Sequence, residues 1–188
     1  MAGQRHLGST PYSPAQRRVA TAAMELIAQH GVNGTSLQMI ADALGVTKAA
    51  VYHQFKTKEA IVIAAMELEL TRLNTALDAA ESQPGPRARE VLLRQVIDLS
   101  VERRRMVSTI QHDPVIVRIL AEHGPFQDYM SRLFGALLGG ATDTVSRLRV
   151  AMVASAIGGV VTHPLVADLD DERMRSMVLE VARQFLDL

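Results

Sequence analysis

The chain has 188 residues, which is enough for one or two small domains with a buried core. It contains no cysteine, so disulfides, thiolate metal sites and a cysteine nucleophile are excluded, and its 4% of aromatic residues favours helices over a β-sandwich. The net charge is zero, but residues 1–58 carry six Lys and Arg against two acids, whereas residues 59–188 carry 14 against 18. This asymmetry directs attention to the basic N-terminal part.

No segment of the sequence has the pattern of a membrane span or a signal peptide. The longest apolar run, Val150 to Val161, is too short to cross a bilayer. The first 14 residues lack an apolar core and are polar. We therefore expect a soluble, cytoplasmic protein whose residues 1–12 form a disordered N-terminal arm.

The next segment carries four helix starts in close succession. Each start is marked by a hydroxyl residue in the N-cap position, and these are Ser13, Thr35, Thr47 and Thr57. Gly31 and Gly45 are expected to end the first two helices. The second and third helices are too short to be stable alone, so they must pack on their neighbours. Two short helices joined by a glycine-containing turn predict a helix-turn-helix domain over residues 13–58.

The fourth helix is expected from residue 58 to about residue 80, and five more follow near residues 87–105, 114–123, 125–138, 144–162 and 169–188. The predicted fold class is all-α, with about nine helices. A three-helix helix-turn-helix head at the N-terminus is fused to a larger C-terminal helical bundle, which spans residues 59–188.

The third helix is the candidate for contact with DNA. Helical spacing points Val51 inward and places four residues on the outward face: Lys48, Ala49, Tyr52 and His53. A helix fits the major groove, where a lysine reaches guanine acceptors and an alanine contacts a thymine methyl group. Three further groups are of types that bind phosphate: the Thr47 and Tyr52 hydroxyls and the Lys58 ammonium. The alternative is that these lysines are merely solvated, and charge and spacing alone leave both interpretations open.

The stretch "TSLQMIADALGVTKAAVYHQFKTKEAIV" resembles the DNA-binding signature of TetR-family transcriptional repressors. The likeness covers about residues 14–65. It implies a homodimer that binds a palindromic operator in double-stranded DNA. Phosphate contacts are then expected from Ser36, Thr47, Tyr52 and Lys58, and base contacts from Gln38, Lys48, Ala49 and His53.

The remaining helices offer an apolar chamber and a dimer surface. The candidate effector-binding residues are Met66, Leu70, Leu99, Met106, Ile110, His112, Phe126, Tyr129, Met130 and Leu133. The candidate interface residues are Ala151, Ala154, Ser155, Gly158, Met174, Met177, Val178, Val181 and Phe185. Both sets have the helical spacing of a plain intramolecular core as well, so core packing is the alternative for each.

These features predict a repressor that is released by a small apolar effector. A helical adaptor or ligand-binding protein with a non-functional head, or a small-molecule enzyme, are the rival interpretations. The sequence has no G-x-S-x-G elbow, P-loop, G-x-G-x-x-G or histidine pair with metal spacing. We therefore expect no enzyme activity, no metal and no cofactor.

Overall fold

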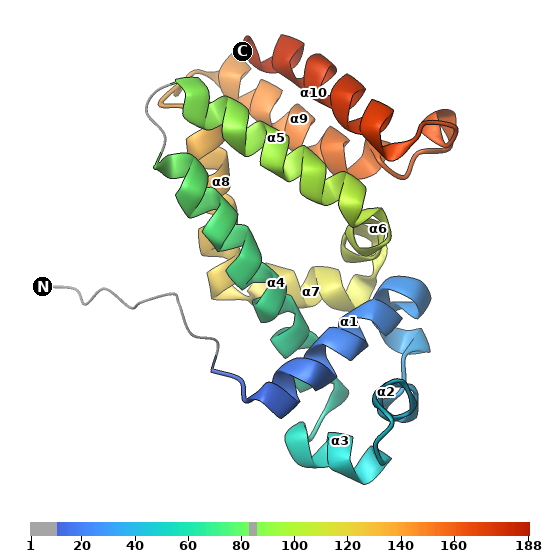
Figure 1. Ribbon diagram of the computed structural model, residues 1–188. Helices are drawn as coiled ribbons and strands as arrows, with labels where there is room; N and C mark the ends of the chain where they lie inside the picture. Colours follow the sequence, from blue (N-terminus) through green and yellow to red (C-terminus); the bar gives the residue numbers. More distant parts are fainter. Residues whose placement is uncertain (1–10, 83–85) are drawn as a thin grey trace, which may run out of the picture.

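The computed structural model describes residues 11–82 and 86–188, and within them it contains only helices (Figure 1). The all-α prediction is confirmed for this part of the chain, and residues 1–10 of the predicted arm lie outside it. The helices are α1 (Pro14–Gly34), α2 (Leu37–Leu44), α3 (Lys48–Gln54), α4 (Lys58–Glu81), α5 (Pro86–Glu102), α6 (Arg104–His112), α7 (Pro114–Glu122), α8 (Gly124–Leu138), α9 (Thr144–Val160), the 3₁₀ helix η1 (Pro164–Val166) and α10 (Asp171–Leu186).

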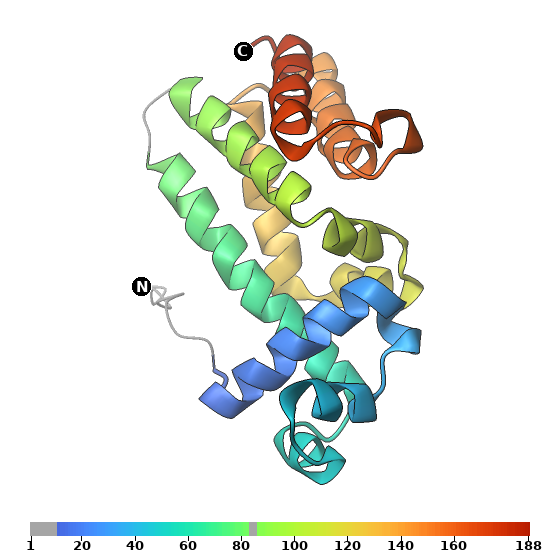
Figure 2. The same ribbon diagram turned by 45° about the vertical axis from the view of Figure 1, so that its right-hand side comes forward.

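The helices form a small head and a larger body that α4 joins. Helices α2 and α3 lie at one end of the molecule, and α9 and α10 lie side by side at the opposite end in both views (Figures 1 and 2). Helix α4 runs from the head along the body, where it packs on α5 and α8. A displacement of α4 would therefore affect both the head and the body helices on which α4 packs.

Local capping explains where the helices of the head begin. Ser13 and Gln16 form the complete capping box that the sequence predicts. The hydroxyls of Thr47 and Thr57 accept hydrogen bonds of 3.1 and 3.0 Å from backbone amides one turn later. Gly45 ends α2 in the left-handed conformation, at φ 65°. Each of these contacts joins residues at most four positions apart.

The start of α2 differs from the sequence-based expectation. The N-cap is Ser36, whose hydroxyl accepts the Met39 amide at 3.1 Å, and not Thr35. Thr35 is buried, and its hydroxyl donates to the Gly31 carbonyl at 2.8 Å. The reason is that the chain kinks at Gly31 (φ 70°, ψ 171°) and adds a further turn before α2 begins.

The segment expected as one helix over residues 87–105 forms two helices, so the described chain has ten α-helices and not nine. The break is at Arg103, which has φ −118° and ψ 33°. Its guanidinium donates to Glu69 of α4 at 2.9 Å, and the next residue, Arg104, pairs with Asp171 of α10. The break directs α6 onto α1. Because neither proline nor glycine occurs at the break, it left no signal in the sequence.

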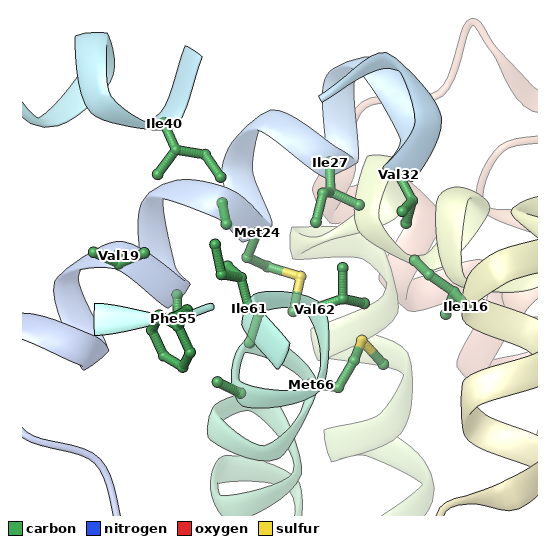
Figure 3. Packing of buried hydrophobic residues seen from close by; sticks show 14 of the residues in the cluster. Val19, Met24, Ile27, Val32, Ile40, Phe55, Ile61, Val62, Met66 and Ile116 are labelled. Carbon is green, nitrogen blue, oxygen red and sulfur yellow. The ribbon is translucent and has the colours of Figure 1, made fainter. Parts of the chain in front are cut away.

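The core of the head extends into the body. It includes Ile61 and Met66 of α4 and Ile116 of α7 besides the residues of α1 to α3. Figure 3 shows these side chains directed toward one another from α1, α2, α4 and α7. A second core joins the rest of α4 to α5, α8, α9 and α10. The predicted domain boundary between residues 58 and 59 thus divides one continuous hydrophobic core.

Candidate nucleic-acid interface

Helix α3 is anchored on one side and exposed on the other. Val51 has no exposed surface and Phe55 is buried just after the helix ends, so both point into the core as predicted. The four residues of the expected outward face, Lys48, Ala49, Tyr52 and His53, are all exposed. Packing on one side fixes the helix, which leaves the opposite side free to meet a partner.

The Tyr52 side chain is 51% exposed and has a cationic neighbour. The Lys56 ammonium lies 4.9 Å from the centre of the Tyr52 ring, within the range of a cation–π contact. The pair presents a hydroxyl and an ammonium group on the same side of the head. Lys56 was not among the residues predicted to bind DNA. Its position in the sequence between Lys48 and Lys58 could have indicated it.

Three further polar residues that were predicted to contact DNA are exposed on the surface of the head. Ser36 and Thr47 are exposed N-caps whose hydroxyl oxygens accept amide protons, and their own hydroxyl protons remain available to a phosphate oxygen. Gln38 is exposed on α2, where its amide donates to Asp42 at 2.7 Å. DNA binding by Gln38 would therefore require that this intrahelical bond be exchanged.

Lys58 occupies a different position from the one expected of a phosphate-binding residue. It is half-buried, and its ammonium donates to the Val32 carbonyl at 2.8 Å and to the Thr35 carbonyl at 3.2 Å. These carbonyls belong to the end of α1, so Lys58 fastens the start of α4 to the α1–α2 connection. An ammonium has three donors, and a phosphate contact by Lys58 stays a prediction.

The predicted effector residues lie in several environments. Met66, Leu70, Met106, Tyr129 and Leu133 are buried, and Leu99, Phe126 and Met130 are half-buried. Burial raises the pKa of the Tyr129 hydroxyl to about 12, although the Arg132 charge opposes this. The side chain of Ile110 lies outside the described part.

One predicted effector residue, His112, does not face the interior. Its ring is exposed at the end of α6, and Nδ1 lies 2.8 Å from the Ser108 carbonyl oxygen of the preceding turn. The reason is the orientation of α6, which turns Met106 into the head core and leaves the last residue of the helix in solvent. His112 therefore does not line a chamber in this structure.

An apolar groove of about 310 Å³ lies between α9 and α10, and it is lined by the five predicted dimer residues of α10 but by none of the four predicted in α9. Met177, Val181 and Phe185 of α10 are exposed along it. Val178 and Ala154 are half-buried, and Ala151 and Ser155 are exposed. The apolar face extends over three exposed residues of α9 that are not among the predicted interface residues: Val145, Leu148 and Met152.

Two predicted interface residues are buried within the chain. Met174 is 1% exposed, because it belongs to the core between α10 and its neighbours. Gly158 is buried against α6, and a Cβ atom there would lie 1.9 Å from Nε2 of Gln111. The small-residue stripe of α9 thus faces partly inward, and the exposed apolar face is on another side of the same helix.

No described helix has both the length and the apolar character that crossing a membrane requires. The three-helix head with one exposed, cationic helix face and the helical body define a helix-turn-helix protein. The family model for bacterial regulatory proteins of the tetR family matches residues 20–65. This match falls within the N-terminal segment whose sequence resembles the DNA-binding signature of that family.

Known proteins are similar to this chain in sequence or in fold. The HTH-type transcriptional regulator AcrR from Shigella flexneri is 34% identical over 101 residues, which cover 50% of this chain and 46% of that protein. This chain covers less than half of the length of the curated relatives that it matches.

Solved structures support the same fold over nearly the whole chain. The fatty acid degradation regulator FadR from Bacillus halodurans has a TM-score of 0.74 at 20% identity, and covers 94% of this chain and 97% of its own. AibR, solved with isovaleryl coenzyme A and operator DNA, has a TM-score of 0.64 at 24% identity, with 89% and 97% covered. At these identities the likeness concerns the fold.

Proposed function

We propose that this protein is a sequence-specific DNA-binding transcriptional regulator that inserts α3 into the major groove of an operator. The observation that carries the proposal is the exposed face of α3, held rigidly by Val51 and Phe55 on its buried side. Lys48 and Ala49 lie at the start of this face, where side chains reach base edges, and the Tyr52 and Thr47 hydroxyls flank it at positions suited to phosphates. A protein with this role works in the cytoplasm, where its operator is.

We further propose that two copies bind the operator as a homodimer through the apolar face of α9 and α10. A palindromic operator presents two half-sites about 34–36 Å apart or a multiple of that distance, so two recognition helices are needed. Exposed Met177, Val181 and Phe185 provide the contiguous apolar surface that a two-fold interface requires. The face lies at the end of the body opposite to α3, so both heads remain free (Figure 2).

The protein is proposed to act as a repressor that a small apolar effector releases. The chamber would be lined by the buried apolar residues of α4, α6 and α8, such as Leu70 and Leu133. Support comes from AibR and from the Bacillus subtilis FadR, which were solved with isovaleryl coenzyme A and stearoyl-CoA, respectively. A hundredfold loss of operator affinity requires about 2.7 kcal/mol of differential effector binding, an ordinary allosteric coupling.

Footprinting of the purified protein on the DNA upstream of its own gene tests the DNA-binding proposal. A protected palindrome is expected. Tyr52→Phe should weaken binding to every sequence, because it removes a phosphate contact, whereas Lys48→Ala should relax the preference at one base position. Equal losses on all sequences would contradict the base-reading role of Lys48.

The rival functions give different results in the same experiments. If the protein is an adaptor or a ligand-binding protein with a non-functional head, no DNA is protected, although apolar compounds still raise its thermal midpoint. If it is an enzyme, a panel of small-molecule substrates shows turnover. Protection of a palindrome without turnover favours the regulator over both.

A further inference from the structure

We propose that the Glu67 carboxylate couples the α7–α8 corner of the body to the end of the recognition helix, so that DNA binding depends on the conformation of that corner. Glu67 lies in the middle of α4, where one of its oxygens meets the body and the other meets the segment that precedes α1. This inference rests on the proposed function, because it assigns a route of regulation to it.

The body end of the link is His123, the single residue between α7 and α8. Its Nε2 lies 3.1 Å from Oε1 of Glu67, and only 15% of its side chain is exposed. Its other ring nitrogen, Nδ1, is buried and has no hydrogen-bond partner among the residues that the structure describes. A buried nitrogen without a partner destabilises this arrangement, which lowers the cost of moving the corner to one that satisfies it.

The corner that carries His123 is also in contact with both cores. Phe126, in the first turn of α8, packs against the head core and against the body core. A molecule that displaces Phe126 would therefore move the backbone of the helix start three residues away. The contact between His123 and Glu67 transmits such a movement to α4 and to Tyr12, the partner of the second carboxylate oxygen.

The head end of the link is Tyr12, which precedes α1. The Tyr12 hydroxyl donates to Oε2 of Glu67, and its ring lies 6.2 Å from the Phe55 ring, at a tilt of 48°. Phe55 is the C-cap of α3, so Tyr12 touches the residue that directly follows the recognition helix. A second contact lies beside the first, since the Gln16 amide donates to the Gln54 carbonyl at 3.3 Å. Through Tyr12, the carboxylate of α4 therefore influences the position of the end of α3.

Another carboxylate of α4 provides a matched control. Glu69 accepts from Arg103 of the α5–α6 break at 2.9 Å and pairs with Arg72 at 3.2 Å. Both glutamates are partly buried on the same helix and both contact the body. Glu67 bonds in addition to Tyr12, whereas the partners of Glu69 belong to α4 and to the body. Removing each in turn thus separates loss of a body contact from loss of the link to α3.

Hydrogen exchange on the full-length protein, without DNA or effector, tests the link directly. Glu67→Ala is expected to increase the exchange rates of the amides of residues 51–55 about tenfold, because the end of α3 loses its support. Glu69→Ala should leave these rates unchanged. Glu67→Gln should recover most of the protection, since an amide accepts from Tyr12 and donates to a histidine nitrogen. Equal effects of Glu67→Ala and Glu69→Ala on α3 would overturn the proposal.

A second comparison asks whether the corner acts through Glu67. His123→Ala should also increase exchange in residues 51–55, but should add nothing when Glu67 is already alanine. Additive effects of the two substitutions would refute the route through Glu67. If Glu67→Ala lowers the overall stability, Tyr12→Phe provides the same test, because it removes one oxygen atom and keeps the ring against Phe55.

The DNA upstream of the gene then links the route to function. Glu67→Ala and His123→Ala should change the affinity for this duplex by the same factor, and Glu69→Ala should not change it. If the wild-type protein binds no part of this DNA, the proposed function fails, while the exchange rates still decide whether the link exists. If DNA binds and the three variants have equal affinities, the inference fails and the proposed function stands.

Discussion

The Val32 amide, near the end of α1, donates a hydrogen bond of 2.8 Å to Oδ2 of Asp113, at the junction of α6 and α7. The other oxygen of Asp113 accepts from the Val115 amide at 2.9 Å and from the Ile116 amide at 3.4 Å. One carboxylate thus caps α7 and fastens the head to the body across 81 positions of sequence.

Replacing Asp113 tests both functions of this carboxylate. Asp113→Ala removes the N-cap of α7, which contributes about 1 kcal/mol. It also removes the hydrogen bond from the Val32 amide to a charged carboxylate, which contributes roughly 1.5–3 kcal/mol. We expect the free energy of unfolding to fall by about 2.5–4 kcal/mol in urea denaturation. Asp113→Asn should lose less, because asparagine also caps helices well. Unchanged stability in both variants would contradict the double role.

Gly31 is a position where a side chain should be poorly tolerated. Its φ of 70° with ψ of 171° is a conformation that glycine adopts readily, and an added Cβ would lie 3.1 Å from the Asp113 carboxylate. Gly31→Ala should therefore lower the free energy of unfolding by roughly 1–3 kcal/mol. Gly135→Ala is the control, because it lies inside α8 with open space around it and should stabilise the protein by about 0.5–1 kcal/mol. Thermal denaturation of both variants tests this prediction, because the midpoint temperature should fall for Gly31→Ala and rise for Gly135→Ala.

Lys58 and Lys48 should differ in what their loss affects. Lys58→Met leaves the Val32 and Thr35 carbonyls without the ammonium, so its main effect should be a loss of stability of about 1–3 kcal/mol. Lys48 is exposed on α3, so Lys48→Ala should leave stability within about 0.5 kcal/mol of wild type and weaken operator binding. Urea denaturation and DNA titration on the same samples separate the two. A pure loss of DNA affinity in Lys58→Met would restore the phosphate-binding role to that residue.

The apolar face of α9 and α10 should govern oligomeric state. Val181 is 53% exposed beside the groove, so Val181→Glu should leave the fold intact and weaken self-association at least tenfold. Val117 of α7 is 46% exposed away from this face, and Val117→Glu is the matched control. Analytical ultracentrifugation over a concentration series measures both. Dimers of undiminished strength in Val181→Glu would exclude this surface.

Tyr12 should make stability depend on alkaline pH. Burial, the hydrogen bond to Glu67 and the negative charge of Glu67 raise the pKa of the Tyr12 hydroxyl well above its ordinary value of 10.0. A pKa raised by folding means that the stabilising contribution is complete below pH 10 and is lost as the pH rises above it. The thermal midpoint of wild type should therefore exceed that of Tyr12→Phe at pH 8, and this difference should shrink by pH 11. Tyr129, also raised, titrates equally in both proteins and cancels.

Local features of this chain could be predicted because their causes lie within a few residues. The capping box of Ser13 and Gln16 and the left-handed Gly45 depend on nearest neighbours in sequence. The inward position of Val51 and the outward position of Tyr52 follow from helical spacing alone. These residues sufficed to predict the head and the exposed face of its third helix.

Long-range contacts decided the remaining features. The break at Arg103, the carbonyl partners of Lys58 and the burial of Gly158 against Gln111 each depend on helices that are distant in sequence. Spacing identifies the apolar side of a helix, but it does not identify the neighbour against which that side packs. The sequence by itself therefore determined which helices form and which residues α3 presents, because those causes are local. Only the tertiary structure decided which side of α9 stays exposed and how the head is attached to the body, because these depend on the relative placement of whole helices.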